Sequence, residues 1–283
     1  MTWTICLSKA TAYLESKGVE DARVAAELLM ARLLRVGRGF IASALEKEPS
    51  KRELEAMRRG MARLVQGEPI QYVLGEWDFR RLTLKCDSRA LIPRPETEEL
   101  VTRVLAHLRT IDFSPVVIDV GTGTGAIALS LAKEAERGVF IASDVSEDAL
   151  ALARENAAKT SLADKVKFVA MDGLDDFDEP NCLDVIVSNP PYVESAVCER
   201  LARRVRDFEP RLALDGGKSG LDFYERYLAD GLNLLRPNGA VFFEIGENQG
   251  AAVAKLMKDY GFDEIKIEKD FAGHDRYASA KLK

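Results

Sequence analysis

An apolar segment that passes directly into a glycine-rich loop is the feature that most limits the folds open to this chain. Residues 116–120 read Val-Val-Ile-Asp-Val, which is typical of a buried strand because the run is β-branched and too short for a helix. The sequence Gly-Thr-Gly-Thr-Gly follows at 121–125, and a helical pattern extends from 126 to 135. Glycines let the backbone approach a ligand closely, and a helix N-terminus offers free amides. This unit predicts an open α/β sheet with a ligand-binding loop.

Strands and helices alternate along the rest of the chain, which predicts an α/β fold with a mostly parallel sheet and helices on both faces. Further strands are expected at 139–143, 166–170, 183–187 and 240–245, with a closing pair at about 264–268 and 276–282. Helices are expected at about 97–108, from about 146, and at about 197–206, 221–235 and 249–260. Prolines stiffen the segment 91–95, either as a helix entry or as a lid edge beside a site. A loop at 208–217 has enough glycine to fold back over that site.

Acidic residues at the ends of the second and third strands favour a nucleoside ligand over an empty glycine turn. The glycine loop alone also matches a dinucleotide fingerprint. Asp144 follows about 20 residues later, where a carboxylate can accept from both ribose hydroxyls. Asp144 can also cap the helix that starts near Ser146. Asp172 is placed to accept from an adenine amino group, although Asp172-Gly173 is also a common turn sequence.

The fourth strand ends in Asn189-Pro190-Pro191-Tyr192, a stiff loop that presents hydrogen-bond acceptors. Neither proline has an N–H to donate, and Pro190 pushes Asn189 into an extended conformation. Two acceptors can hold both N–H bonds of a planar NH2 group and direct its lone pair at an electrophile. The ring of Tyr192 can stack on that group and attract a sulfonium. The alternative is a proline turn that merely ends a strand.

Residues 1–67 contain helical patterns only, and they predict a small helical bundle. Ser50 and Glu53 form a capping box for a third helix that ends near Val65. That helix carries a basic run, which is either a solvated face or a contact for an acidic partner. Alternating residues at 76–86 predict a hairpin. We therefore expect a helical domain at 1–75, a hairpin linker at 76–92 and an α/β domain at 93–283.

Composition argues against several classes of function. The net charge of the 283 residues is −6, whereas nucleic-acid-binding domains are usually basic. The four cysteines form no C-x-x-C pair and the two histidines stand apart, so we expect neither a metal site nor a disulfide framework. No apolar run approaches membrane-spanning length, and the first residues lack a signal-peptide layout. These features predict a cytoplasmic protein without membrane contact.

Several longer motifs resemble one enzyme family over nearly the whole chain. They are Gly-Glu-Pro-Ile-Gln-Tyr at 67–72, Leu-Ile-Pro-Arg-Pro-Glu-Thr-Glu at 91–98, residues 119–125 and 189–192, Glu209-Pro210 with Gly216-Gly217, and Glu244-Ile245-Gly246 with Gln249. With these motifs the chain resembles the protein-(glutamine) methyltransferases of peptide chain release factors, the PrmC or HemK family. Two departures are visible. Arg80 stands where members commonly have an aromatic residue, and Gly173 where some have a bulky one.

The resemblance implies an S-adenosylmethionine-dependent enzyme with the class I methyltransferase fold, which is Rossmann-like. It also implies that the N-terminal domain helps to recognise class I release factors and that the acceptor is the glutamine of their Gly-Gly-Gln motif. The expected cofactor-binding residues are Gly121, Thr122, Gly123, Thr124, Gly125, Asp144, Asp172, Gly173 and Asn189. Asn189, Pro190 and Tyr192 are expected to be catalytic, and Asn189, Pro190, Pro191 and Tyr192 to bind the substrate glutamine.

Three other functions use parts of the same pattern. An amino-methyltransferase acting on adenine in DNA or RNA would use the acceptor loop equally well, but the acidic net charge opposes it. A nicotinamide-dependent dehydrogenase would share the glycine loop and leave Asn189-Pro190-Pro191-Tyr192 without a role. A non-catalytic binding module would not need the acceptor loop at all.

Overall fold

The computed structural model of this protein describes residues 1–175, 177 and 179–283. The chain forms two units, of which the first contains Met1–Glu76 and Ala202–Phe208. The second contains Trp77–Leu201 and Glu209–Lys283. Compared with the expected division at 75 and 92, the hairpin belongs to the second unit, and a short segment from the middle of the chain belongs to the first.

The first unit is a helical bundle, in agreement with the sequence pattern. Its elements are α1 (Trp3–Ser16), α2 (Ala22–Leu34), the 3₁₀ helix η1 (Arg38–Ala44), α3 (Lys51–Val65), α4 (Ile70–Leu74) and α9 (Arg203–Arg206). Large apolar side chains such as Trp3, Met30 and Met57 form its core. The predicted capping box is confirmed, because the Ser50 hydroxyl accepts from Glu53 N at 3.2 Å and the Glu53 carboxylate accepts from Ser50 N at 2.7 Å.

Among the basic residues of α3, one arginine forms an ion pair and the others have exposed side chains. Arg63 pairs with Glu68 at 2.6 Å and also donates to the carbonyl oxygens of Tyr72 and Val73, so it ties the end of α3 to α4. The other basic side chains of the run are exposed: Lys51, Arg52, Arg58 and Arg59.

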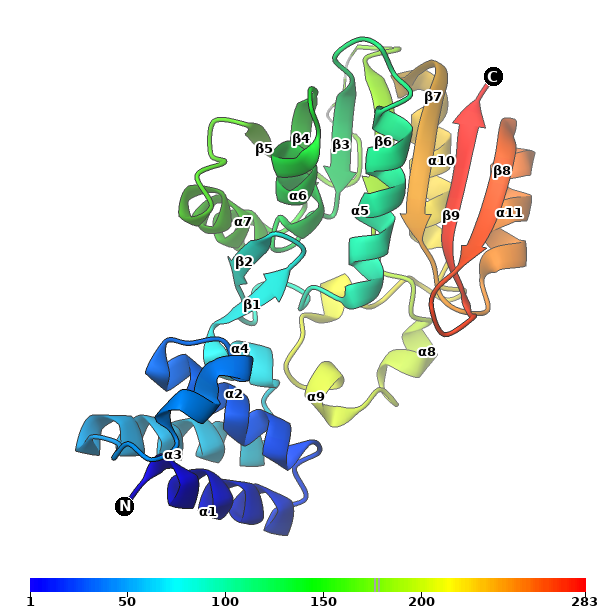
Figure 1. Cartoon of the computed structure of the whole chain (residues 1–283). Coiled ribbons are helices and arrows are strands. Elements are labelled where there is room, and N and C mark those ends of the chain that lie inside the picture. The colour runs from blue at the N-terminus through cyan, green and yellow to red at the C-terminus, as the bar shows by residue number, and fades with distance from the viewer. Residues whose placement is uncertain (176, 178) are drawn as a thin grey trace. The chain divides into compact units, whose positions relative to one another are not determined.

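The second unit contains a seven-stranded sheet in the order β5-β4-β3-β6-β7-β9-β8. The strands are β3 (Val116–Val120), β4 (Val139–Asp144), β5 (Val166–Ala170), β6 (Leu183–Ser188), β7 (Leu235–Glu244), β8 (Phe262–Lys269) and β9 (Asp275–Leu282). Strands β3 to β7 are parallel, and β9 runs antiparallel to both of its neighbours. In Figure 1 the arrowheads of β3 and β7 point to the lower edge of the sheet and that of β9 to the upper edge. The predicted mostly parallel sheet is confirmed.

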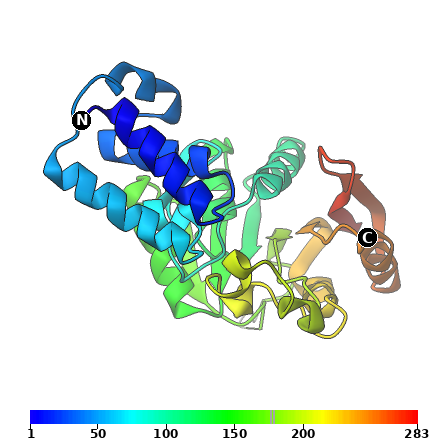
Figure 2. The same ribbon diagram turned by 90° about the horizontal axis from the view of Figure 1, so that it is seen from below.

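Helices cover both faces of this sheet because the strands are apolar on both sides. Val117 packs with α5 (Pro95–Leu108) and α6 (Ala126–Glu134), whereas its neighbour Ile118 packs with α10 (Asp222–Leu234) and α11 (Gly250–Asp259). The end of α7 (Glu147–Lys159) joins the first of these clusters. Figure 2 shows α5 on one side of the strands and α10 on the other.

The hairpin β1 (Glu76–Phe79) and β2 (Leu82–Lys85) is confirmed, with Arg80 at its turn in a left-handed conformation, φ 50°. The Arg80 guanidinium pairs with Glu134 at 2.7 Å and donates to the Glu98 carbonyl and Thr102 Oγ1 at 2.6 and 2.7 Å. Arg80 therefore fastens the hairpin to α5 and α6 through polar contacts at the position where family members commonly have an aromatic ring.

The helix expected at about 197–206 is wrong. Two short helices replace it, α8 (Ser195–Cys198) and α9, and Ala202 between them is extended with ψ 138°. Helix α9 has no buried residue, so no packed face supports one continuous helix there. Arg203 and Arg206 pair locally with Asp207, at 3.2 and 2.8 Å, whereas Arg204 pairs with Glu20 of the same unit.

Candidate active site

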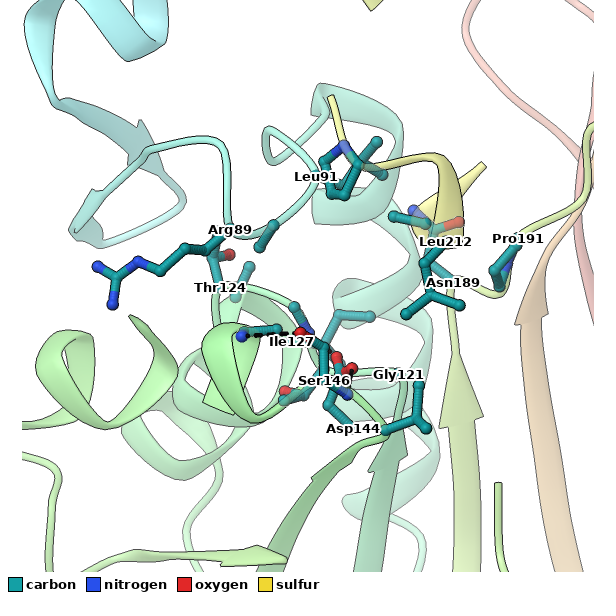
Figure 3. Close-up of a pocket in the computed structure, with 18 of the residues that line it drawn as sticks. Arg89, Leu91, Gly121, Thr124, Ile127, Asp144, Ser146, Asn189, Pro191 and Leu212 are labelled. Atoms are coloured by element: carbon teal, nitrogen blue, oxygen red, sulfur yellow. Dashed lines mark hydrogen bonds between the residues drawn. The ribbon is translucent and has the colours of Figure 1, made fainter. Parts of the chain in front are cut away.

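One pocket opens at the carboxyl edge of the parallel strands, beside the point where the strand order reverses. Strand β3 lies between β4 and β6, so the chain leaves β3 in one direction for β4 and β5 and later returns on its other side to β6. Open α/β sheets bind ligands at this position. The empty space of the pocket, counted together with its open mouth, is about 980 Å³. Figure 3 shows Asp144 and Asn189 reaching it from different strands, with Leu91 on the side away from the sheet.

The loop after β3 lies against the pocket with its glycines in left-handed conformations. Gly121 and Gly123 have φ values of 72° and 56°, and both line the pocket together with Thr122 and Thr124. A side chain built on Gly121 would project into open space, so this glycine leaves room beside the backbone. Gly125 has φ 82° and does not line the pocket, since its Cα faces Leu129, whose Cδ1 would lie 3.0 Å from an added Cβ. Its role is to begin α6.

Asp119, at the fourth position of β3, supports this loop from below and was not singled out by the sequence patterns. One carboxylate oxygen accepts from Thr122 Oγ1 at 2.5 Å and from Ala128 N at 3.1 Å. Its other oxygen is buried without a hydrogen-bond partner among the described residues. Burial raises the pKa of Asp119 to about 7. The sequence signal that could have identified Asp119 is an acidic residue inside an otherwise apolar strand.

Asp144 ends β4 and lines the pocket as expected. Its two carboxylate oxygens accept from Gly123 N and Ser146 N, each at 2.9 Å. Ser146 itself caps α7, because its hydroxyl accepts from Ala149 N. Asp144 therefore does not act as the helix cap, and it lines the pocket. Burial raises the pKa of this carboxyl as well.

The turn after β5 is held by an arginine that sequence reasoning missed. Asp172 and Gly173 line the pocket, but Asp172 Oδ1 already accepts from Arg226 Nη1 at 2.7 Å. Gly173 has φ 66°, and a Cβ there would lie 3.0 Å from the Arg226 guanidinium. Phe223 and Tyr227, one helical turn apart on α10, line the same part of the pocket. This aromatic wall stands near the position where some family members carry a bulky residue.

The Asn189-Pro190-Pro191-Tyr192 loop contributes two of its four residues to the pocket. Asn189 and Pro191 line it, whereas Pro190 is buried. Tyr192 lies outside the lining, and its hydroxyl is 3.5 Å from Glu244 Oε1. The expected stacking surface is therefore not formed by Tyr192 in this structure.

Glycines of a later segment press directly on this loop. A Cβ on Gly216 would lie 2.6 Å from the Pro191 carbonyl oxygen, and one on Gly220 would lie 2.4 Å from that of Tyr192. The side-chain NH2 of Gln249 donates to the Tyr192 carbonyl at 3.0 Å. The loop is thus clamped from two sides, which explains why the motif residues after it are glycines.

An ion pair between a partly exposed arginine and a buried glutamate joins two segments that line the pocket. Arg94 pairs with Glu209 at 2.5 Å, and the other Glu209 oxygen accepts from Ile92 N at 3.1 Å. Glu209 is only 5% exposed. The pair joins the proline-stiffened segment to the loop that begins with Pro210, and both line the pocket. The segment 91–95 is thus both the entry to α5 and an edge of the pocket, so the two alternatives for it hold together.

Comparisons with known proteins decide the family. Residues 6–75 match the family described as PrmC N-terminal domain, and residues 99–207 match Methyltransferase small domain. A release factor glutamine methyltransferase of Moorella thermoacetica is 39% identical over 277 residues, which cover 98% of this chain and 97% of that protein. One of Rhodopirellula baltica is 34% identical over 284 residues, covering 98% and 96%. This chain belongs to the release factor glutamine methyltransferase family.

Membership of the release factor glutamine methyltransferase family confirms the resemblance carried by the motifs and makes the protein a methyltransferase. Its fold is that of the class I enzymes. The N-terminal domain of human METTL16, solved in complex with SAH, superimposes with a TM-score of 0.52 at 20% identity, covering 71% of this chain and 75% of that one. Among the described residues, no helix has the length and apolar character needed to cross a membrane, and no cluster of three or more acidic, histidine or cysteine residues could hold a metal ion.

Proposed function

We propose that the protein transfers a methyl group from S-adenosylmethionine to the side-chain amide nitrogen of the glutamine in the Gly-Gly-Gln motif of class I release factors. One observation supports this most directly: the glycine loop after β3 and Asn189 after β6 line a single pocket. A site for a nucleoside cofactor and an acceptor for an amide N–H therefore lie side by side. Family membership supports the choice of acceptor.

The residues of the pocket fit the cofactor. Open space above Gly121 allows a ligand to approach the backbone closely, and Asp144 lines the pocket where it would accept from the ribose hydroxyls. The adenine would lie near Asp172 and Gly173, against Phe223 and Tyr227. When bound, S-adenosylmethionine supplies a methyl group on a positively charged sulfur. These assignments are proposals about which side chains hold it.

The acceptor loop would bind the glutamine by its amide hydrogens. Asn189 Oδ1 and the Pro190 carbonyl oxygen accept the two N–H bonds, favour a pyramidal nitrogen and direct its lone pair at the methyl carbon. With the cofactor bound, its sulfonium would supply the methyl group to this nitrogen and leave as the neutral thioether, and the extra proton on nitrogen would pass to water. Catalysis comes mainly from positioning, which can supply about 7 to 11 kcal/mol at best. Pro191 would form the wall beside the amide, and Tyr192 would support the loop from behind.

The N-terminal unit would recognise the release factor, and its basic α3 would be one candidate contact surface. The enzyme would act in the cytoplasm, where release factors work, without a metal ion or a stable complex with nucleic acid.

Mass spectrometry of a purified release factor incubated with the enzyme and S-adenosylmethionine tests the proposal. We expect one added methyl group on the peptide that contains Gly-Gly-Gln, and none when that glutamine is replaced by asparagine. DNA and RNA oligonucleotides serve as the second substrate in the same assay. Methylated adenine in them, with an unmodified release factor, would contradict the proposed function.

A further inference from the structure

We propose that Thr97 is a positioning residue that sets which way the Asn189 amide points, with Glu244 holding the Thr97 hydroxyl hydrogen. The inference rests on the proposed function, because it concerns the acceptor oxygen that would bind the glutamine. It concerns side chains that lie far apart in the sequence and meet behind the acceptor loop.

The three side chains form a continuous hydrogen-bonded chain. Thr97 lies in the first turn of α5, is 4% exposed and borders the pocket. Its Oγ1 lies 2.6 Å from Glu244 Oε2 and 3.1 Å from Asn189 Nδ2. Glu244 is the last residue of β7 and is 1% exposed. The Tyr192 hydroxyl lies 3.5 Å from its other oxygen.

The direction of these bonds follows from the donors available. An ionised carboxylate can only accept, so the single hydroxyl hydrogen of Thr97 must point to Glu244. Thr97 Oγ1 then has only lone pairs for Asn189, so the NH2 end of the Asn189 amide must face Thr97. The opposite end, Oδ1, is left for a donor on the pocket side. The chain from Glu244 to Asn189 therefore turns an acceptor toward the site.

Without this control the amide could turn over within the same shape. An asparagine side chain has an acceptor at one end and two donors at the other, and the two ends occupy similar volumes. In the reversed orientation its NH2 would meet the NH2 of the substrate glutamine, and two donors repel each other. Proline at 190 and 191 removes competing backbone donors. The donor that remains near the substrate is the NH2 group of Asn189 itself. Thr97 would keep this NH2 group turned away from the substrate.

Protonation of Glu244 should weaken this control. A protonated carboxyl can donate to Thr97, whose own hydrogen is then free to turn to Asn189 and to stabilise the reversed amide. Burial raises the pKa of Glu244 to about 7, while Arg276 lowers it. Turnover should therefore rise with pH through about 7. The titratable and charged groups that face Glu244 are Glu96, Tyr192, Tyr224, Arg276 and Tyr277.

The test compares four full-length proteins in the release factor methylation assay: wild type, Thr97→Val, Thr97→Ser and Thr102→Val. Valine keeps the shape of threonine without its hydroxyl. We expect Thr97→Val to lower kcat on the order of 10²-fold with little change in the Kd for S-adenosylmethionine measured by calorimetry. Thr97→Ser keeps the hydroxyl and should retain turnover. Thr102→Val removes a hydroxyl from the same helix, where it contacts Arg80, and should leave kcat unchanged.

Wild-type kcat in folded Thr97→Val would overturn the inference, as would a loss in Thr97→Ser equal to that in Thr97→Val. If Thr97→Val does not fold, the pH profile of Glu244→Gln decides. That variant cannot ionise, so the fall in kcat below about pH 7 seen in wild type should vanish. An unchanged profile would refute the role of Glu244. If the proposed function itself fails, wild type does not methylate the release factor, which is a different outcome from an active Thr97→Val.

Discussion

The two halves of the pocket are constructed in different ways. On the glycine-loop side, polar groups are satisfied within one strand–helix–strand unit, β3-α6-β4, and the residues directly after it. Asp144 accepts from Gly123 N, 21 positions away, and from Ser146 N, and Asp119 accepts from Thr122 and Ala128. On the acceptor side, Asn189 contacts Thr97, which is 92 positions away, and Thr97 contacts Glu244, which is 147 positions away. Apart from the pairing of Asp172 with Arg226, the first half is therefore a local unit around β3 and β4, whereas the second exists only when distant elements have packed together.

This difference suggests a division of labour. A local unit can hold a common cofactor in many proteins, because its shape depends little on the rest of the chain. An acceptor side assembled from α5, β6 and β7 can be adjusted by each of those elements. Substitutions in the two halves should then separate into effects on cofactor affinity and effects on turnover.

The largest separation is expected for Asn189→Ala. Removing the proposed acceptor should lower kcat on the order of 10³-fold, by analogy with the loss of one preorganised hydrogen-bonding group in other enzymes. The Kd for S-adenosylmethionine should stay close to that of wild type, because the cofactor groups lie on the other half. Stopped-flow or steady-state methylation with calorimetry on the same sample measures both. Near-normal turnover would end the proposed mechanism.

The free energy of unfolding should depend on pH because the carboxyl of Asp119, on the glycine-loop side, is buried. The pKa of Asp119 is about 7 when folded and lies near 3.8 in an exposed aspartate. Between these values the native protein holds a proton that the unfolded chain releases, so the free energy of unfolding falls as pH rises, by at most about 1.4 kcal/mol per pH unit. Above about pH 7 this contribution is constant.

Asp119→Asn is the matched variant, since it keeps the shape and cannot ionise. Urea unfolding of the two proteins from pH 4 to pH 8 should show a smaller loss of stability in the variant. Parallel curves for both proteins would show that Asp119 is already ionised in the native state at low pH.

Asp144→Ala should weaken the binding of the cofactor and leave the rate of methyl transfer unchanged. A hydrogen bond to a charged group contributes about 1.5 to 3 kcal/mol, so losing the ribose contact should weaken S-adenosylmethionine binding by roughly 10- to 10²-fold. At saturating cofactor, kcat should remain near that of wild type. A drop in kcat without a change in Kd would contradict the division between the two halves.

The same contrast explains what sequence reasoning could predict. The strand before the glycine loop and the Ser50 capping box depend on residues within a few positions, and Asp144 depends on Gly123 and Ser146 at the ends of the same strand–helix–strand unit. The structure places all of them as expected. The orientation of Tyr192 and the pairing of Asp172 with Arg226 depend on residues about 50 positions away, and these were missed.

The family motifs predicted more residues of the acceptor half than the periodicity of apolar residues did. Thr97 and Glu244 both lie in segments that resemble the family, yet neither pattern shows that they touch. From the sequence alone, Thr97 is an ordinary residue at the start of a helix. Its hydroxyl gains a partner only because β7 brings Glu244 beside it. The helix expected at 197–206 failed for a related reason, since its apolar spacing had no core to face.

Gly216→Ala offers the finest test, because it changes the acceptor half without removing a polar group. The added methyl would lie 2.6 Å from the Pro191 carbonyl oxygen and 2.8 Å from Tyr192 Cα, both of them backbone atoms. Overpacking of this kind costs about 1 to 3 kcal/mol and shifts the backbone. We expect a lower melting temperature and a loss of kcat, with an unchanged Kd for the cofactor. Gly75→Ala is the control for a glycine outside the site, since nothing lies within 4 Å of its added Cβ although its φ of 75° strains alanine. Equal losses of kcat in both variants would mean that the effect comes from general destabilisation and not from displacement of the acceptor loop, and the contrast between the two halves of the pocket would then be wrong.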